Sequence, residues 1–148
     1  MGMKLKIKRK RHKEIEPLEG AMRVKVGFPE GEVGDDILER AVYNHYGTSR
    51  GIPARPFLLN AVRANQAKYK RFLQSQAKKV LSGETSQLRV LDQLGVMAEG
   101  DVKKEITRLR TPPNAPSTIK QKGSSNPLID TGEMRASVTY VVDEDTLL

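Results

Sequence analysis

An apolar stripe runs through residues 86–109, where hydrophobic side chains recur every three or four positions. The stripe comprises Leu88, Leu91, Leu94, Ala98, Val102, Ile106 and Leu109. This period places the side chains on a single helical face, so the sequence predicts an amphipathic helix from about Ser86 to Leu109. Such a helix has to bury its stripe against other elements, which restricts the chain to folds that pack helices on a sheet or on one another.

Two further helical patterns precede the stripe. Residues 37–44 form an amphipathic segment that Asp35 or Asp36 can cap and that Gly47 can end. A longer pattern covers residues 56–81 and begins with a proline, which suits the first turn of a helix. Its apolar positions are Leu58, Val62, Tyr69, Leu73, Ala77 and Val80. The sequence therefore predicts three helices in succession.

Strict alternation of side chains predicts strands on either side of these helices. In residues 22–28 and again in residues 136–142, every even-numbered side chain is apolar. Residues 3–7 alternate as well, which is typical of a strand with one buried face or of an arm that becomes a strand on docking. We expect an α+β fold in which a small antiparallel sheet packs against two or three helices.

The length of 148 residues suits one domain. We expect a basic N-terminal arm at residues 1–20, a single α+β domain at 21–142 and an acidic C-terminal tail at 143–148. A long proline-rich loop, residues 111–132, offers little apolar surface, so we expect it to be mobile in a free subunit and ordered by a partner. Only 37% of the residues are hydrophobic, which predicts a modest core.

The sequence offers little for catalysis or cofactors. It contains no cysteine, which excludes disulfides, thiol catalysis and cysteine-bound metals and fits a reducing compartment. We find no metal-ligand spacing, no glycine-rich phosphate loop and no apolar run near the roughly 20 residues of a membrane span. His45 is a catalytic base or a packing residue, and the absence of a Gly-x-Ser-x-Gly elbow favours packing. We predict no catalytic residue, metal site, cofactor or membrane contact.

Charge is distributed in blocks of alternating sign around a net charge of +8. The basic arm carries Lys4, Lys6, Lys8, Arg9, Lys10 and Arg11. Residues 14–39 hold eight acids and two bases, and residues 57–83 hold six bases and no acid. The arm lacks aromatic residues for stacking on single strands, but its cations suit phosphates as well as an acidic protein surface. Both nucleic acid and protein therefore stay open as partners.

Two loops have unusual composition. Pro53 and Pro56 restrict the backbone around Arg55, which predicts a stiff connection that holds this guanidinium at the surface or at an interface, where it suits a carboxylate. In the proline-rich loop, short helical turns are expected where Ser117 or Thr118, and then Asp130 and Thr131, act as caps.

Four stretches in order carry a resemblance to a known family. They are residues 43–48, an aromatic-glycine-threonine turn; residues 52–58, the proline pair; residues 113–118; and residues 127–135. Their order and spacing resemble the putative tail-component and virion-morphogenesis family of long-tailed bacteriophages, whose members are called tail-completion, tail-terminator or head–tail joining proteins. The resemblance spans roughly residues 21–142.

The resemblance implies a structural virion protein without catalysis or cofactor. It implies a ring of six copies at the phage neck or tail top, where the protein completes the tail and joins it to the head. Its partners would be other copies, neighbouring neck or connector proteins and tail-tube proteins, with genome DNA passing nearby. Such a protein is made in the host cytoplasm and localised in the virion. A basic nucleic-acid-binding module is the alternative, and a toxin-like nuclease, for which no catalytic set is visible, is the third reading.

We expect subunit or partner contacts at the two unusual loops. The candidate interface residues are Tyr46, Thr48, Ile52, Pro53, Arg55, Pro56, Asn114, Pro116 and Asp130. We expect residues 3–11 of the basic arm to point away from the DNA channel and to add as a strand to a neighbouring sheet edge. Acids between Glu14 and Glu39, or Asp143 to Asp145 of another copy, are the candidate partners of these lysines.

Overall fold

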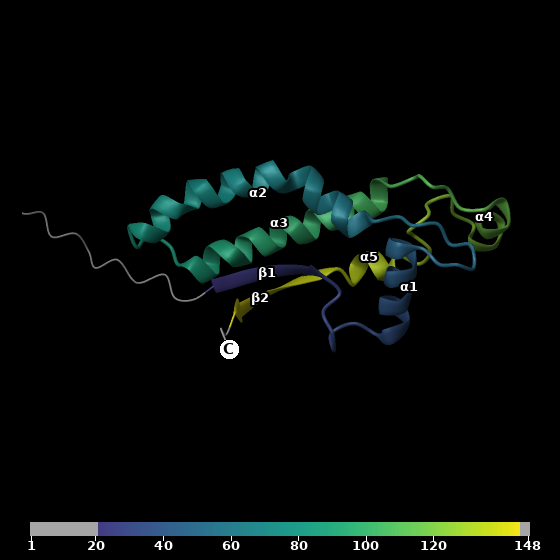
Figure 1. Cartoon of the computed structure of the whole chain (residues 1–148), viewed down its shortest axis with the longest axis horizontal. Coiled ribbons are helices and arrows are strands. Elements are labelled where there is room, and N and C mark those ends of the chain that lie inside the picture. The colour runs from purple at the N-terminus through teal and green to yellow at the C-terminus, as the bar shows by residue number, and fades with distance from the viewer. Residues whose placement is uncertain (1–20, 146–148) are drawn as a thin grey trace, which may run out of the picture.

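The computed structural model describes residues 21–145, and the basic arm with its predicted strand at 3–7 lies outside them. The elements in chain order are β1 (Ala21–Gly27), α1 (Asp35–Tyr46), α2 (Phe57–Leu81), α3 (Gln87–Arg108), α4 (Pro116–Lys122), α5 (Glu133–Ala136) and β2 (Thr139–Asp145). Helix α3 lies between α2 on one side and the two strands on the other, and α1, α4 and α5 gather at one end (Figure 1). The predicted α+β fold is confirmed.

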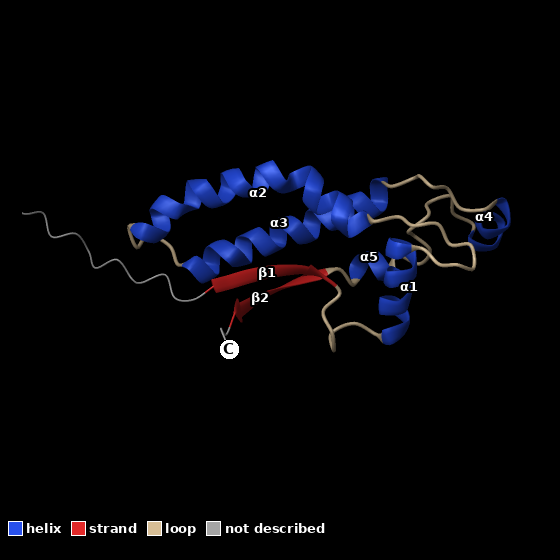
Figure 2. Ribbon diagram, viewed as in Figure 1, coloured by secondary structure: helices blue, strands red, loops and turns tan. Residues whose placement is uncertain are grey.

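The sheet consists of β1 and β2, paired antiparallel from Ala21 opposite Asp145 to Gly27 opposite Thr139 (Figure 2). In β1 the predicted alternation is confirmed, because Arg23 and Lys25 are exposed while the even-numbered side chains are half-buried.

Strand β2 differs from its prediction at both ends. It begins three residues late, because Ala136 belongs to the short helix α5. It also continues through Asp145, so the backbone of residues 143–145, predicted as the start of an acidic tail, extends the sheet. Asp143 pairs with Lys25 across the two strands, which gives the acidic end of β2 a basic partner strand.

Helix α3 is the centre of the core. Val102 and Ile106 are fully buried, and they pack in one cluster with Phe57 of α2 and Val138 beside β2. The apolar stripe is thus confirmed over most of its length, but Leu88 at its start remains 54% exposed. Helix α3 begins where predicted, since the Ser86 hydroxyl accepts a hydrogen bond from the backbone N–H of Arg89.

Helix α2 is buried only near its start. Phe57 and Ala61 are its buried residues, whereas Leu73 of the predicted stripe is 38% exposed. Further along, α2 is joined to α3 through Asp101, a buried carboxylate that both Lys68 and Tyr69 contact. Sequence analysis missed this polar link, because its charged members stand on two different helices with no pattern to connect them.

The predicted caps of α1 are half right. Gly34, not Asp35 or Asp36, is the residue before the helix, and the two acids lie in the first turn, where they face the positive end of the helix dipole. Gly47 ends α1 as predicted with a φ of 75°. A Cβ at Gly47 would lie 2.8 Å from the carbonyl oxygen of Ile52, so the turn requires glycine.

The segment predicted as a long proline-rich loop holds more structure than expected. It contains α4, which starts at Pro116 without a side-chain cap, so the predicted caps at Ser117 or Thr118 are wrong. A helical turn does follow Thr131, whose hydroxyl accepts from the N–H of Glu133, although Gly132 is the residue before this helix. Leu128 is buried in the core, so the loop offers more apolar anchorage than its composition indicated.

Candidate subunit interface

Arg55 is buried, which contradicts its predicted place at the surface with a carboxylate partner. Only 2% of the residue is exposed. Its Nε donates to the carbonyl oxygen of Pro112 at 2.7 Å, and its Nη2 donates to the carbonyl oxygen of Pro113 at 3.1 Å. Side-chain oxygens of Asn114 and Asn44 accept further bonds at 3.2 and 3.4 Å. The guanidinium is therefore held by neutral oxygens inside one subunit.

This arrangement ties three distant segments together. The backbone N–H of Arg55 donates to the carbonyl oxygen of Asn44 at the end of α1, and the side chain reaches the chain after α3. Desolvation lowers the pKa of Arg55, yet the guanidinium stays charged in the physiological range. Its bonds give the carbonyl groups of Pro112 and Pro113 a fixed hydrogen-bond donor. We assign Arg55 to the stability of the subunit.

Loop 47–56 folds into a tight turn that leaves one large apolar side chain exposed. The N–H of Thr48 donates to the carbonyl oxygen of Ile52 at 2.9 Å, and the N–H of Ile52 donates back to the Thr48 hydroxyl at 3.3 Å. Ile52 is 38% exposed, whereas Pro53 and Pro56 are half-buried. Ile52 is therefore the member of this loop best placed for an intermolecular contact.

Three large side chains extend the exposed apolar area onto α1. Val42 and Tyr46 are one turn apart on the helix, and Tyr43 lies beside them. Their exposed fractions are 43%, 75% and 40%, while Ala41 on the opposite side is buried in the core. We call Val42, Tyr43 and Tyr46 the α1 surface. Single exposed apolar residues are common, but several on one short helix are typical of an interaction site.

The remaining candidate residues do not form one patch. Asn114 accepts from Arg55 and is half-buried, and its Nδ2 has no hydrogen-bond partner. Pro116 is exposed at the start of α4. Asp130 is exposed and lines a small pocket of about 160 Å³ together with Arg40 and Asn44 of α1. The structure thus brings Asp130 near the Arg55 cluster, whereas Lys4 to Arg11 of the basic arm lie outside the described residues.

His45 packs against aromatic rings and is not set up as a base. Its ring centroid lies 4.6 Å from that of Tyr46 and 5.4 Å from that of Phe57. Burial lowers the pKa of His45, and its Nδ1 has no hydrogen-bond partner. No orienting carboxylate contacts it in the described structure, so the geometry favours the packing role that the sequence indicated.

Within residues 21–145, no group of three or more His, Asp or Glu side chains is arranged to hold a metal ion. Within the same residues, no helix has the length and apolar character needed to cross a bilayer.

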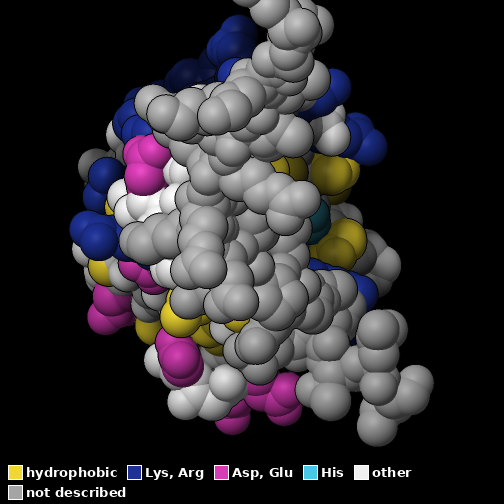
Figure 3. Space-filling view, turned by 90° about the vertical axis from the view of Figure 1, so that its left-hand side faces the viewer, with side chains coloured by type: hydrophobic (Ala, Val, Ile, Leu, Met, Phe, Trp, Pro, Cys, Tyr) yellow, Lys and Arg dark blue, Asp and Glu magenta, His cyan; other side chains and the backbone are white. Residues whose placement is uncertain are grey.

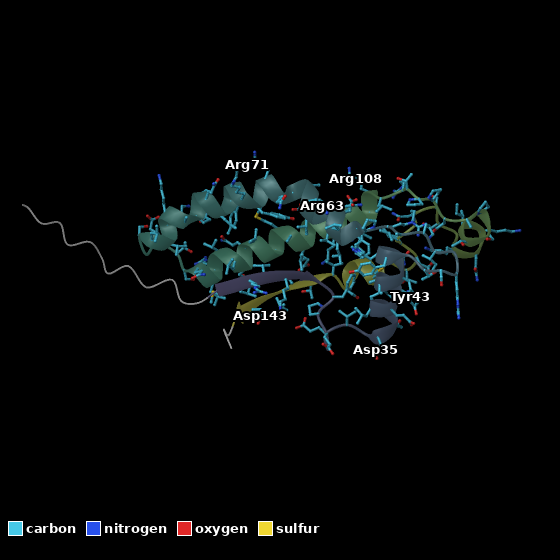
Figure 4. All side chains as sticks on the ribbon, in the orientation of Figure 1. Asp35, Tyr43, Arg63, Arg71, Arg108 and Asp143 are labelled. Atoms are coloured by element: carbon cyan, nitrogen blue, oxygen red, sulfur yellow. The ribbon has the colours of Figure 1, made fainter. Side chains whose placement is uncertain are left out.

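The solvent side of α2 forms a second distinctive surface. Arg63, Lys70, Arg71 and Lys78 recur there at helical spacing and are all exposed. Figure 4 shows Arg71 on the side of α2 that faces away from α3. At the end of the molecule where α2 turns into α3, hydrophobic side chains reach the surface among basic ones (Figure 3). Leu81 and Leu88 are 48% and 54% exposed near this turn.

Comparison with known proteins adds no relative. No protein-family model, curated protein or solved structure matches this chain. The resemblance to the tail-completion family thus rests on the four sequence stretches, and the structural evidence on function rests on the two exposed surfaces.

Proposed function

We propose that this protein is a structural virion subunit that assembles with copies of itself into a ring at the neck or tail top of a long-tailed phage. In this role it completes the tail and joins it to the head. The phage setting and the number of six copies come from the four resembling stretches. The role requires binding surfaces and no bond-making chemistry.

The observation that carries the proposal is the α1 surface with neighbouring Ile52. These large apolar side chains stay 38% to 75% exposed in the single subunit. Complete burial of such a side chain contributes about 1.5–3 kcal/mol, so covering several of them supplies much of the free energy of a subunit contact. A subunit that leaves this surface open gains stability when a second copy covers it.

The test is the mass of the full chain in solution, measured by light scattering and native mass spectrometry. We expect a closed oligomer for the parent and dissociation for Tyr46→Ser. Leu73→Ser is the matched control, because Leu73 is also a partly exposed apolar residue but lies far along α2. A parent chain that stays monomeric at every concentration overturns the proposal. In the phage, assembly without this protein should yield heads and tails that are not joined to each other.

A second candidate function is binding of nucleic acid, favoured by the basic side of α2. Arg63, Lys70, Arg71 and Lys78 are exposed there, and residues 57–83 contain no acid to offset them. Salt titration of duplex DNA binding separates the candidates. A DNA-binding module shows affinity that falls steeply with salt, because each neutralised phosphate releases counterions. For the neck subunit we expect only weak binding without sequence preference.

A further inference from the structure

An open groove of about 730 Å³ follows the free edge of β2. Its lining consists of residues 139–142 of β2 and Ser86, Leu88, Arg89 and Asp92 of α3. No β1 residue lines it, so the groove lies on the side of β2 away from β1. Since the sheet formed by residues 21–145 has two strands, the backbone of β2 has no strand partner on that side.

The floor of the groove is held in place by Tyr140. Its hydroxyl donates to Asp92 Oδ1 at 2.6 Å, and its ring packs directly on Gly95, where a Cβ would approach the ring within 2.1 Å. Leu88 of α3 also lines the groove and is 54% exposed. Val96, two turns further along the same side of α3, is 57% exposed but is not one of the lining residues.

A bare edge of this kind is suited to a third strand. Its unpaired N–H and C=O groups form a template for an extended segment, and β2 carries no proline that would block pairing. A two-stranded sheet is marginally stable unless further strands or helices cover it. The groove supplies two parts of a strand-addition site, namely free backbone groups and open space beside them.

We propose that residues 3–8 of a second copy of this chain occupy the groove as a third strand next to β2. The inference rests on the proposed self-assembly and names the contact that it uses. Alternation places Met3, Leu5 and Ile7 on one face of the added strand. They span about 13 Å at 3.3 Å per residue, close to the about 12 Å between Leu88 and Val96 along α3. The apolar face of the segment thus matches the exposed apolar side chains of α3.

Alternation also places the lysines of the segment on the outer face of the sheet. Because Tyr140 faces α3, alternation turns Val141 and Asp143 outward, and Figure 4 shows Asp143 on the side of the sheet away from α3. An added strand with its apolar face on α3 presents Lys4, Lys6 and Lys8 on the same outer side as Asp143, which is already paired with Lys25 of β1.

The lining of the β2 groove carries no excess of positive charge. The lining of the β2 groove balances one base, Arg89, with one acid, Asp92, and leaves the acidic end of β2 beside it.

The location favours a second copy as the donor. A ring of more than two subunits needs two different complementary surfaces on each subunit. The α1 surface lies at one end of the molecule, and the start of α3, which lines the groove, lies at the other end (Figure 1). The two surfaces are therefore far enough apart to engage different neighbours.

The experiment exploits the absence of cysteine from the native chain. A full-length Leu88→Cys variant is mixed in turn with full-length variants that carry one cysteine at each position from 3 to 8, and the mixture is oxidised. One of the two variants carries an affinity tag that increases its mass, so the mixed disulfide dimer can be distinguished by mass from the dimers of each variant with itself. We expect several-fold more mixed dimer for Met3→Cys, Leu5→Cys and Ile7→Cys than for Lys4→Cys, Lys6→Cys and Lys8→Cys.

The period of two is the signature of a strand whose odd-numbered side chains face α3. Leu59→Cys replaces Leu88→Cys as the control, because Leu59 is 41% exposed on α2 and does not line the groove. Equal cross-linking at all six positions, or equal yields with the Leu59 control, overturns the inference. So does a Leu5→Cys/Leu88→Cys double variant that closes its disulfide only within one chain.

The mass of the parent chain in solution distinguishes failure of the proposed arm contact from failure of the proposed self-assembly. A parent that forms a closed oligomer without the alternating cross-links overturns the arm contact and leaves self-assembly standing. A parent that is monomeric and gives no mixed dimer overturns both.

Discussion

Arg55 donates from Nε to the carbonyl oxygen of Pro112 at 2.7 Å, across 57 positions of sequence. This bond, with those to Pro113 and Asn114, closes the loop after α1 onto the loop after α3. The two proline-rich segments thus have complementary roles. Pro53 and Pro56 stiffen the backbone that carries Arg55, and Pro112 and Pro113 present the carbonyl oxygens that accept from its guanidinium.

Replacing Arg55 with Ala should lower the free energy of unfolding by about 1–3 kcal/mol, because several buried acceptors lose their donor. Arg55→Lys should recover only part of this loss, since an ammonium group lacks the planar fork that reaches both proline carbonyls. Urea unfolding of the two variants measures the effect. The control is Arg63→Ala on the exposed side of α2, which should stay within about 0.5 kcal/mol of the parent. An Arg55→Ala protein as stable as the parent contradicts the buried role.

Gly95→Ala and Gly100→Ala should change stability in opposite directions, although both glycines lie inside α3. A Cβ at Gly95 would meet the Tyr140 ring within 2.1 Å, so the strand has to shift, and overpacking of this kind costs about 1–3 kcal/mol. A Cβ at Gly100 meets nothing within 4 Å, so the better helix propensity of alanine should add up to about 1 kcal/mol. Thermal unfolding of the two variants tests this, and equal shifts would refute the packing of Tyr140 on α3.

Tyr69 should make the protein less stable at high pH. Burial, together with its bond to Asp101, raises the pKa of Tyr69 well above the usual 10. The folded chain therefore keeps the phenol proton at a pH where the unfolded chain has lost it, so stability is fully present below pH 10 and falls as the pH rises above it. Denaturant unfolding between pH 9 and 11 measures the slope. Tyr69→Phe should flatten it, and an unchanged slope in this variant assigns the effect to other groups.

His45 should make the protein less stable on acidification. Burial against aromatic rings lowers the pKa of His45, so the unfolded chain takes up a proton before the folded chain does. The stability present above the ordinary pKa of about 6.5 should be lost as the pH falls from there toward the folded value. An NMR titration of the His12→Gln variant follows the single remaining imidazole. An imidazole that titrates at or above the ordinary pKa contradicts the buried placement.

Local patterns in the sequence determined the elements whose residues interact with near neighbours. The stripe of α3, the alternation of β1 and the turn at Gly47 could all be predicted, because side-chain periodicity and the conformational freedom of glycine act over a few residues. The family resemblance also came from order and spacing alone. These signals predicted the α+β fold.

Tertiary structure alone decided where long-range partners meet. The sequence predicted Arg55 at the surface or at an interface. Neither the residue type nor the flanking prolines indicate that its guanidinium binds carbonyl oxygens near residue 112. Strand β2 extends through Asp145, because β1 pairs with its acidic end, and Leu128 of the proline-rich segment packs in the core. In each case the stabilising contact joins groups that are far apart in the chain, so short-range sequence patterns cannot predict it.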